Sequence, residues 1–286
     1  MMKTISTRNS HVRRAMLPAL TAAALVPVAL LLGAGNALAN HTVLVEGEQD
    51  FDGDGLLGTD EDGDGDQVFG TLQAAVDGVG DNGRVMVVTS GRFFEQVTLQ
   101  GAGVTVLEAA PGVNAIVEAF NAGDTPENNN ARQQAPGIVV DSDGSFPLEI
   151  RNIVSRNWTD GIQINGSANV TIDNVRLDSN VNYGIHVQDR ARVAVTNSQV
   201  NSSGFRRSGS LGLTPGGEIP PAPGVGIAFE DSSSGFIADT TVAQSFSDGV
   251  TANRKKVKIR DNTFFNNNLG DRGGRGHRGH RGYGGW

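Results

Sequence analysis

The sequence predicts an all-β fold, a parallel β-helix solenoid of about six to seven coils with a short helix over its N-terminal end. The composition gives the first indication: among 286 residues there are 39 Gly, and aromatic residues make up only 6%. Such a profile suits a turn-rich β protein better than a helical bundle. The absence of Cys excludes a disulfide scaffold, a Cys-ligated zinc site and a thiol nucleophile. Two repeated patterns with a shared period supply the other indications.

In the first pattern, a glycine is followed by alternating apolar residues, as in Gly161-Ile-Gln-Ile. Alternation of this kind indicates a strand with one buried face. The glycines are spaced by 24, 23, 42 and 23 residues. The positions are Gly137, Gly161, Gly184, Gly226 and Gly249.

In the second pattern, two alternating apolar residues precede an Asn or Asp, as in Val170-Thr-Ile-Asp-Asn174. These polar positions are spaced by 22, 23, 42 and 22 residues, the period of the glycines. Asn and Asp tolerate left-handed backbone, so we expect bends between strands here, with the asparagine amides stacked as a ladder. The positions are Asn152, Asn174, Asn197, Asp239 and Asp261.

A repeat of 22 to 24 residues built from short alternating strands fits one turn of a parallel β-helix with three strands per turn. Residues 121–136 and 204–223 make their coils longer than the repeat, and we expect them to be inserted loops. At the start, residues 71–76 predict a short helix with Thr71 as its N-cap. It should cover the first coil, whose first strand we place at residues 84–88.

Several segments resemble the pectin-lyase-like right-handed parallel β-helix superfamily. Residues 71–76 and 87–99, with Gly91, Phe93 and Glu95, look like the opening of many members, and residues 160–174 are similar to coils of polygalacturonases and pectate lyases. The resemblance covers residues 70–270 and implies a right-handed solenoid. It does not extend to catalytic motifs. Residues 179–184 lack the Asp pair of polygalacturonases, residues 173–174 lack the Asp-His of pectate lyases, and no pectin methylesterase motif follows Glu95.

Residues 1–39 have the pattern of a secretory signal peptide. They contain four basic and no acidic residues, an apolar run, and a small-residue end at Ala37-Leu-Ala39. Arg13-Arg14 resembles a twin-arginine signal, and a membrane anchor is the alternative that Pro18 and Pro27 disfavour. We expect a secreted or periplasmic protein with no membrane span after cleavage. Without this segment, 19 Lys and Arg face 31 Asp and Glu, a net charge of −12.

Residues 40–70 form an acidic segment with a candidate calcium loop. Ten acids and no base lie between Glu46 and Asp66. Residues 50–61 match the twelve-position loop that surrounds Ca²⁺ with oxygen ligands. A solvated acidic linker is the alternative. The expected ligands are Asp50, Asp52, Asp54, the Leu56 carbonyl, a water at Gly58, and Glu61.

The coils offer one candidate ligand-binding strip. His186 should point outward from its strand, in a row with Gln163 and Ala228, and nearby polar residues suit sugar hydroxyls. The alternative is an ordinary solvated sheet face. A possible ion pair between Arg151 and Asp173 on neighbouring coils we interpret as a surface contact. The strip consists of Gln163, Asn165, His186, Gln188 and Glu230.

The β-helix should occupy residues 71–269 and be followed by a disordered Gly/Arg-rich tail, residues 270–286. Nucleic-acid binding by the arginines of this tail is an alternative, but we expect no specific nucleic acid partner. The sequence predicts no helix after the coil that ends near Phe265, so this end should expose strand edges that favour self-association. The alternative is that charges on this coil prevent association, and the charged residues are Lys255, Lys256, Lys258 and Arg260.

These observations together favour a secreted, calcium-binding β-helix protein that binds polysaccharide or a cell-envelope glycan. One alternative is a polysaccharide lyase or glycoside hydrolase with a non-standard active site. Another is a structural or adhesive surface protein without a small ligand. No catalytic residues are assigned.

Overall fold

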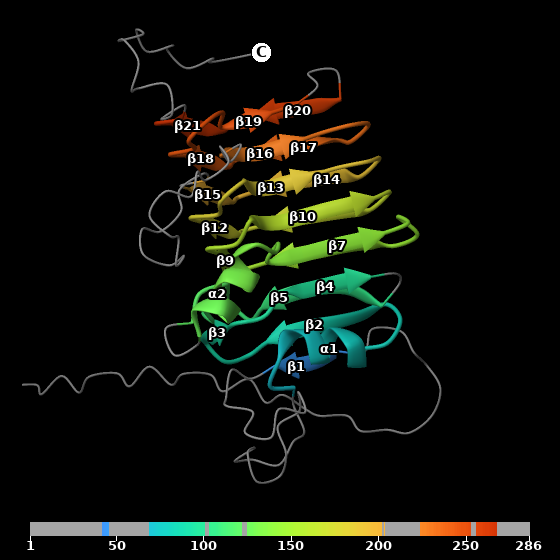
Figure 1. The fold of residues 1–286 in the computed structure, drawn as a ribbon. Coiled ribbons are helices and arrows are strands. Elements are labelled where there is room, and N and C mark those ends of the chain that lie inside the picture. Colours follow the sequence, from blue (N-terminus) through green and yellow to red (C-terminus); the bar gives the residue numbers. More distant parts are fainter. Residues whose placement is uncertain are drawn as a thin grey trace, which may run out of the picture. The chain divides into compact units, whose positions relative to one another are not determined.

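The computed structural model describes residues 42–45, 69–100, 103–121, 125–201, 203, 224–252 and 256–267. Its strands form three parallel sheets, and the chain visits them in turn, so that each coil adds one strand to each sheet (Figure 1). The signal-peptide pattern, the calcium loop and the Gly/Arg-rich tail lie outside the described residues. None of the described helices has the length and apolar character needed to cross a membrane.

Sheet A has eight strands in the order of the chain. They are β1 (Thr42–Val45), β2 (Gly83–Val87), β5 (Val104–Ala109), β8 (Pro147–Arg151), β11 (Asn169–Asp173), β14 (Arg192–Thr196), β17 (Ser234–Ala238) and β20 (Val257–Arg260).

Sheet B has seven strands and sheet C has six. Sheet B consists of β3 (Gly91–Phe93), β6 (Ala115–Glu118), β9 (Ile153–Arg156), β12 (Arg176–Asp178), β15 (Gln199–Asn201), β18 (Thr241–Ala243) and β21 (Thr263–Phe265). Sheet C consists of β4 (Val97–Gln100), β7 (Ile138–Ser142), β10 (Asp160–Gly166), β13 (Tyr183–Val187), β16 (Val225–Phe229) and β19 (Val250–Thr251).

From β2 onward the strands follow the order A, B, C, and they complete six coils before β20 and β21 begin a seventh. The predicted coil number and the three strands per turn are therefore confirmed. Strand β1 pairs with β2 through four residues, from Thr42↔Arg84 to Val45↔Val87. The first coil begins at β2, one residue from the predicted residues 84–88, and β1 adds one more strand to sheet A before it.

The core is a set of apolar columns inside the coils. Ile162 stacks in register on Ile185, and Ile172 stacks on Val195, with all four side chains fully buried. These columns form because alternate residues of each strand point inward, and a 22- to 24-residue period brings equivalent residues into register. The register inferred from the sequence is confirmed.

The bends between sheets A and B fall at the predicted polar positions. All five have left-handed backbone, with φ between 50° and 59°. Asn174 Nδ2 donates a hydrogen bond to Asn152 Oδ1 at 2.9 Å, so these two amides stack as expected. Asn197 instead donates to Asp173 Oδ1 at 2.7 Å. The predicted amide ladder therefore joins Asn152 and Asn174 but does not continue to Asn197.

The recurring glycines lie at the corner where sheet B passes into sheet C. A Cβ atom on Gly184 would overlap the Val200 side chain and would lie 2.6 Å from the carbonyl oxygen of Gly226. Neighbouring coils approach each other so closely at this corner that no side chain fits. This explains why glycine recurs with the period of the coil.

Helix α1 (Leu72–Gly78) closes the N-terminal end of the core. Thr71 accepts a hydrogen bond from the Ala74 amide, as predicted for the N-cap, and Glu95 accepts from the amides of Leu72 and Gln73 at 2.7 and 3.0 Å. Leu72 and Ala75 are fully buried. Burial raises the pKa of Glu95, although the two amide hydrogen bonds oppose the rise.

The first insertion is not only a loop. It contains helix α2 (Pro126–Gln133), which is attached to the coils where Arg132 Nε donates to the Ala119 carbonyl at 3.0 Å. This segment has few apolar residues, so the apolar periodicity that indicates a helix was absent. The second insertion, residues 204–223, lies outside the described residues.

Candidate functional site

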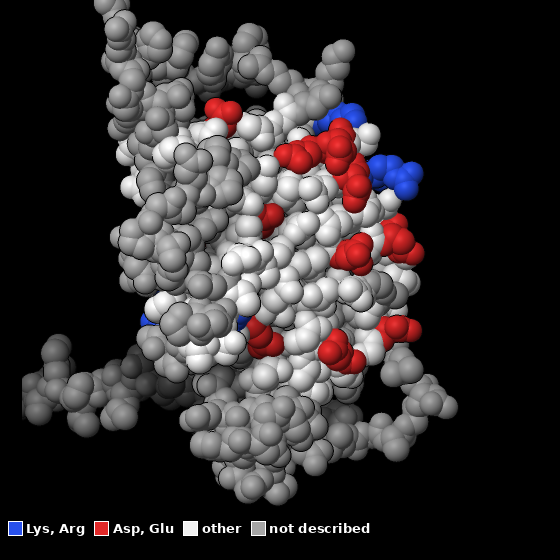
Figure 2. Space-filling model, viewed as in Figure 1, with Lys and Arg blue, Asp and Glu red and all other residues white. Residues whose placement is uncertain are grey.

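The candidate site lies on the outer face of sheet C, which faces the viewer in Figures 1 and 2. Its central row follows from strand register, because Gln163 on β10 pairs with His186 on β13, and His186 pairs with Ala228 on β16. Gln163 points outward because Ile162 and Ile164 on either side of it are buried in the core. The predicted alignment of Gln163, His186 and Ala228 is therefore confirmed. That this row binds a ligand stays a prediction.

Three amides of the predicted strip form one group. Gln163 Nε2 lies within hydrogen-bond distance of two acceptors, Asn165 Oδ1 at 3.2 Å and Gln188 Oε1 at 3.3 Å. All three side chains are partly exposed. The group therefore offers both amide donors and carbonyl acceptors to solvent, which are the groups that bind sugar hydroxyls.

His186 belongs to a second group, which joins three coils. Its Nδ1 lies 3.2 Å from Asp160 Oδ2, and its Nε2 lies 3.1 Å from Glu230 Oε2. The Tyr183 ring stacks on the imidazole with centroids 4.0 Å apart, and its hydroxyl donates to Glu230 Oε1 at 3.2 Å. His186 and Asp160 are buried at 7% and 6% exposure, whereas the Glu230 side chain is 43% exposed.

The surroundings of this group alter two pKa values. Burial by itself lowers the pKa of His186, but hydrogen bonding to Asp160 and Glu230 and the charges of both carboxylates outweigh it. The pKa of His186 is therefore raised above its ordinary value of 6.5. Burial, followed by the nearby charge of Glu230, raises the pKa of Tyr183 to about 12. Tyr183 therefore remains a hydrogen-bond donor at neutral pH.

Sequence reasoning missed Asp160 and Tyr183 as members of the site. The two residues are register partners on β10 and β13, and each directly precedes one of the recurring glycines, Gly161 and Gly184. That shared position is the signal that would have placed them together.

The arrangement differs from the two carboxylates of a glycoside hydrolase. Such enzymes hold an acid and a base on either side of the scissile bond, with room for the sugar between them. Here the imidazole of His186 occupies the space between Asp160 and Glu230. Asp160 is also buried, so only Glu230 and Tyr183 of this group reach solvent.

The face of sheet C is acidic. No Lys or Arg occurs in its six strands, whereas Asp141 and Asp160 belong to them and Glu230 follows β16. Figure 2 shows acidic groups on the described part of this face, with basic groups only towards its edges. The face therefore favours neutral or positively charged ligands over polyanions.

The buried acids on the other two sheets are held by arginines. Glu108 on sheet A contacts Arg84 and Arg151, the latter at 3.5 Å, and Glu118 on sheet B contacts Arg92 at 3.6 Å and Arg156 at 2.6 Å. Arg151 also pairs with Glu149 at 2.6 Å. The expected Arg151–Asp173 pair is therefore wrong, because the acids of its own and the preceding strand are nearer.

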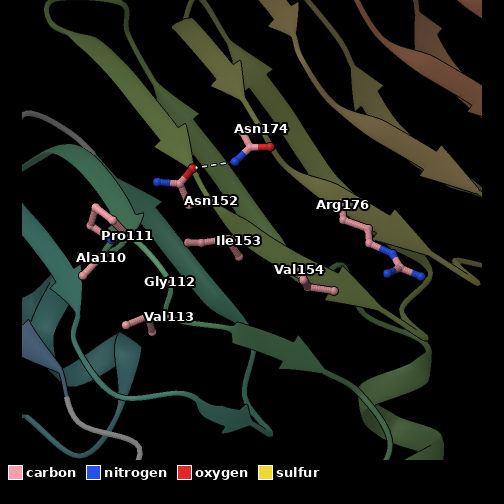
Figure 3. Close-up of a pocket in the computed structure, with 9 residues that line it drawn as sticks. All are labelled: Ala110, Pro111, Gly112, Val113, Asn152, Ile153, Val154, Asn174 and Arg176. Atoms are coloured by element: carbon pink, nitrogen blue, oxygen red, sulfur yellow. Dashed lines mark hydrogen bonds between the residues drawn. The ribbon is translucent and has the colours of Figure 1, made fainter. Parts of the chain in front are cut away.

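A hollow of about 340 Å³ lies where sheet A passes into sheet B (Figure 3). The amides of Asn152 and Asn174 bond to each other beside it, while Arg176 lies apart from them. These polar groups do not converge on one point, so we assign no ligand to the hollow. Its lining residues are Ala110, Pro111, Gly112, Val113, Asn152, Ile153, Val154, Asn174 and Arg176.

Within the described ranges, no three His, Cys, Asp or Glu side chains are grouped so that they could hold a metal ion. The expected calcium ligands, Asp50, Asp52, Asp54, Leu56, Gly58 and Glu61, all lie outside these ranges.

Comparison with known proteins bears on the fold. No curated protein matches the chain. A crystal structure of pectate lyase Pel9A is similar over 80% of this chain and 71% of its own, with 12% identity and a TM-score of 0.40. Residues 136–282, about half of the chain, match the family described as "Right handed beta helix region". This family match confirms the fold that the resemblance in the sequence implied, and the chain belongs to the right-handed β-helix family.

Proposed function

We propose that this protein binds a polysaccharide along the outer face of sheet C, and that the glycan is neutral or carries amino groups. The observation that supports this most is the continuity between the amide group of Gln163, Asn165 and Gln188 and the group of Tyr183, His186 and Glu230. Gln163 and His186 are register partners, so the two groups adjoin across neighbouring strands, which lie about 4.8 Å apart.

A face of parallel strands, with outward side chains aligned in rows, suits an extended polymer. The strands of sheet C repeat the same outward positions from coil to coil, and in the row through Gln163 and His186 these two polar side chains lie between Val139 and Ala228. Sugar hydroxyls can donate to the carbonyl and carboxylate oxygens, and they can accept from amide N–H groups. The exposed part of Tyr183 adds an aromatic surface for a sugar ring.

Charge narrows the class of glycan. A uronate polymer would bring negative charges against a face whose strands contain no Lys or Arg, and the repulsion would oppose binding. Neutral and amino sugars have no such penalty. Hydrolysis is not part of the proposal, because the two acids nearest His186 already pair with it.

The proposal includes export and calcium. The pattern of residues 1–39 supports export to the extracellular space or the periplasm, where such glycans occur. The spacing of acids in residues 50–61 supports a calcium loop in the segment between β1 and α1.

A glycan array on the purified chain tests the binding proposal. We expect neutral or amino-sugar polymers to be retained and polygalacturonate not to be. Replacement of Gln163 and Gln188 by Ala should weaken binding by about 3- to 10-fold for each lost hydrogen bond. Thr171→Ala, on the outer face of sheet A, is the matched control and should bind normally. Equal binding by all variants, or retention of uronates alone, would contradict the proposal.

A further inference from the structure

The two ends of the stack differ in how the core is closed. At the N-terminal end, α1 buries Leu72 and Ala75 completely. The Gln73 side chain also binds the backbone of Thr98 on β4, the first strand of sheet C. Its Oε1 accepts from the Thr98 amide at 2.7 Å, and its Nε2 donates to the Thr98 carbonyl at 3.4 Å. Helix and side chain thus take the place of a preceding coil.

At the C-terminal end the core columns are open. The column through Ile172, Val195 and Ile237 is fully buried, but its last member, Ile259, is 45% exposed. Phe264 continues the column of Val242 and is 41% exposed, whereas Val242 is fully buried. These side chains are core residues, and within the described part of the chain no further coil covers them. Phe265 beside them is 47% exposed.

The strands at this end are also the last of their sheets. β19, β20 and β21 each pair on one side only among the described strands. Edge strands with apolar side chains invite pairing with another chain unless something covers them. Solenoids normally end in a terminal unit that prevents this.

Charge favours one occupant for the open end. Lys256 and Lys258 are exposed on its last coil, and so is Arg260, which pairs with Asp261 at 2.6 Å. Residues 268–286, which follow in the sequence, contain four Arg and one Asp, so they carry the same sign of charge as Lys256 and Lys258. Two copies joined by their C-terminal ends would likewise bring these basic groups together.

The N-terminal end of a second copy has the opposite charge. Asp77 and Asp81, in and after α1, are exposed. The exposed lysines of the C-terminal end and the exposed Asp77 and Asp81 of the N-terminal end are therefore complementary in charge.

We infer that the open C-terminal end of the β-helix docks onto the N-terminal end of a second copy of the same chain. The contact uses two different surfaces, so it leaves one free end of each kind on every assembly. Copies therefore add one after another, and the assembly grows without a closed final size. This inference does not depend on glycan binding by sheet C.

Sedimentation velocity of the full chain over a wide concentration range tests the inference. The average mass should increase continuously with concentration, without a plateau at the dimer, and should decrease as salt screens the charges. Ile259→Asp/Phe264→Asp should remove association. Phe146→Asp is the matched control, because Phe146 is 39% exposed in the middle of the stack, and it should associate like the native chain.

Two further arms keep the test decisive. Lys256→Glu/Lys258→Glu alters only exposed residues and should weaken association while the circular dichroism spectrum stays native. The Ile259→Asp/Phe264→Asp variant retains its N-terminal end, so a small amount of it should shorten native assemblies. A monomer at every concentration, a mass that stops at the dimer, or equal loss in Phe146→Asp would overturn the inference.

Discussion

Asp160 and His186 lie on neighbouring coils, with Oδ2 and Nδ1 3.2 Å apart and both side chains almost completely buried. Asp160 directly precedes Gly161 on β10, and His186 lies two positions after Gly184 on β13. The two residues come into contact because β10 and β13 are adjacent strands. A titratable pair with this degree of burial links the protonation of His186 to the stability of three coils.

The stability of the fold should depend on pH through His186. Its pKa is raised in the folded state above the ordinary value of 6.5. The protonated imidazole therefore contributes stability that is complete below about pH 6.5 and is lost as pH rises through the folded pKa. We expect the melting temperature difference between the native chain and His186→Gln to shrink over that range. An NMR titration of the His186 ring measures the pKa directly, and a value at or below 6.5 would refute the assignment.

The inward register predicts unequal tolerance at adjacent positions of β11. Ile172→Asn places an amide in the fully buried core and should destabilise the fold by about 3 kcal/mol or more. Thr171→Asn, on the outer face, should change stability by less than about 0.5 kcal/mol. Asp173 is a poor control because it accepts hydrogen bonds from Thr196 and Asn197. Chemical denaturation of both variants measures the difference, and equal tolerance would contradict the register.

The corner between sheets B and C predicts a steric effect. Gly184→Ala would place a Cβ atom 2.6 Å from the Gly226 carbonyl oxygen and should destabilise the protein by about 1–3 kcal/mol. Gly103→Ala is the control, because its nearest non-neighbouring atom would lie 3.7 Å away. Thermal melts of both variants should show a lowered melting temperature for Gly184→Ala alone.

Calcium should stabilise the native state if residues 50–61 form the proposed loop. Binding to the folded chain alone raises the free energy of unfolding, by about 2.7 kcal/mol when free Ca²⁺ is 100 times its dissociation constant. Glu61→Gln removes the expected bidentate ligand and should abolish most of the increase. Melting curves with Ca²⁺ and with a chelator measure the effect. If calorimetry detects no heat of Ca²⁺ binding, the calcium loop is refuted and residues 50–61 are a solvated acidic linker.

The repeated parts of the fold were predictable from the sequence because each coil imposes the same physical demands. The corner at Gly184 excludes a side chain, the bend at Asn174 needs left-handed backbone, and the column through Ile172 needs an apolar residue. These demands recur every 22 to 24 residues, so two independent patterns revealed one period.

The parts that occur once were harder to predict. Thr42–Val45 has the alternation of a strand, but 37 residues separate β1 from β2 and it carries no repeat signal, so its place in sheet A could not be predicted. Helix α2 has few apolar residues, and its attachment depends on polar contacts such as Arg132 with Ala119. In the candidate site, Gln163 and His186 were found from their outward register. Tyr183 and Asp160 were missed, because their contacts with His186 depend on side-chain direction at a corner.

Both insertions, residues 121–136 and 204–223, enter the chain at the same corner, between a strand of sheet B and the next strand of sheet C. Strand pairing continues in register on both sides of each, from β4 to β7 and from β13 to β16. The stack therefore does not depend on how many residues pass through this corner. Variation in length can accumulate there without cost to the neighbouring coils, which makes it the natural position for new segments to be acquired or for foreign peptides to be displayed.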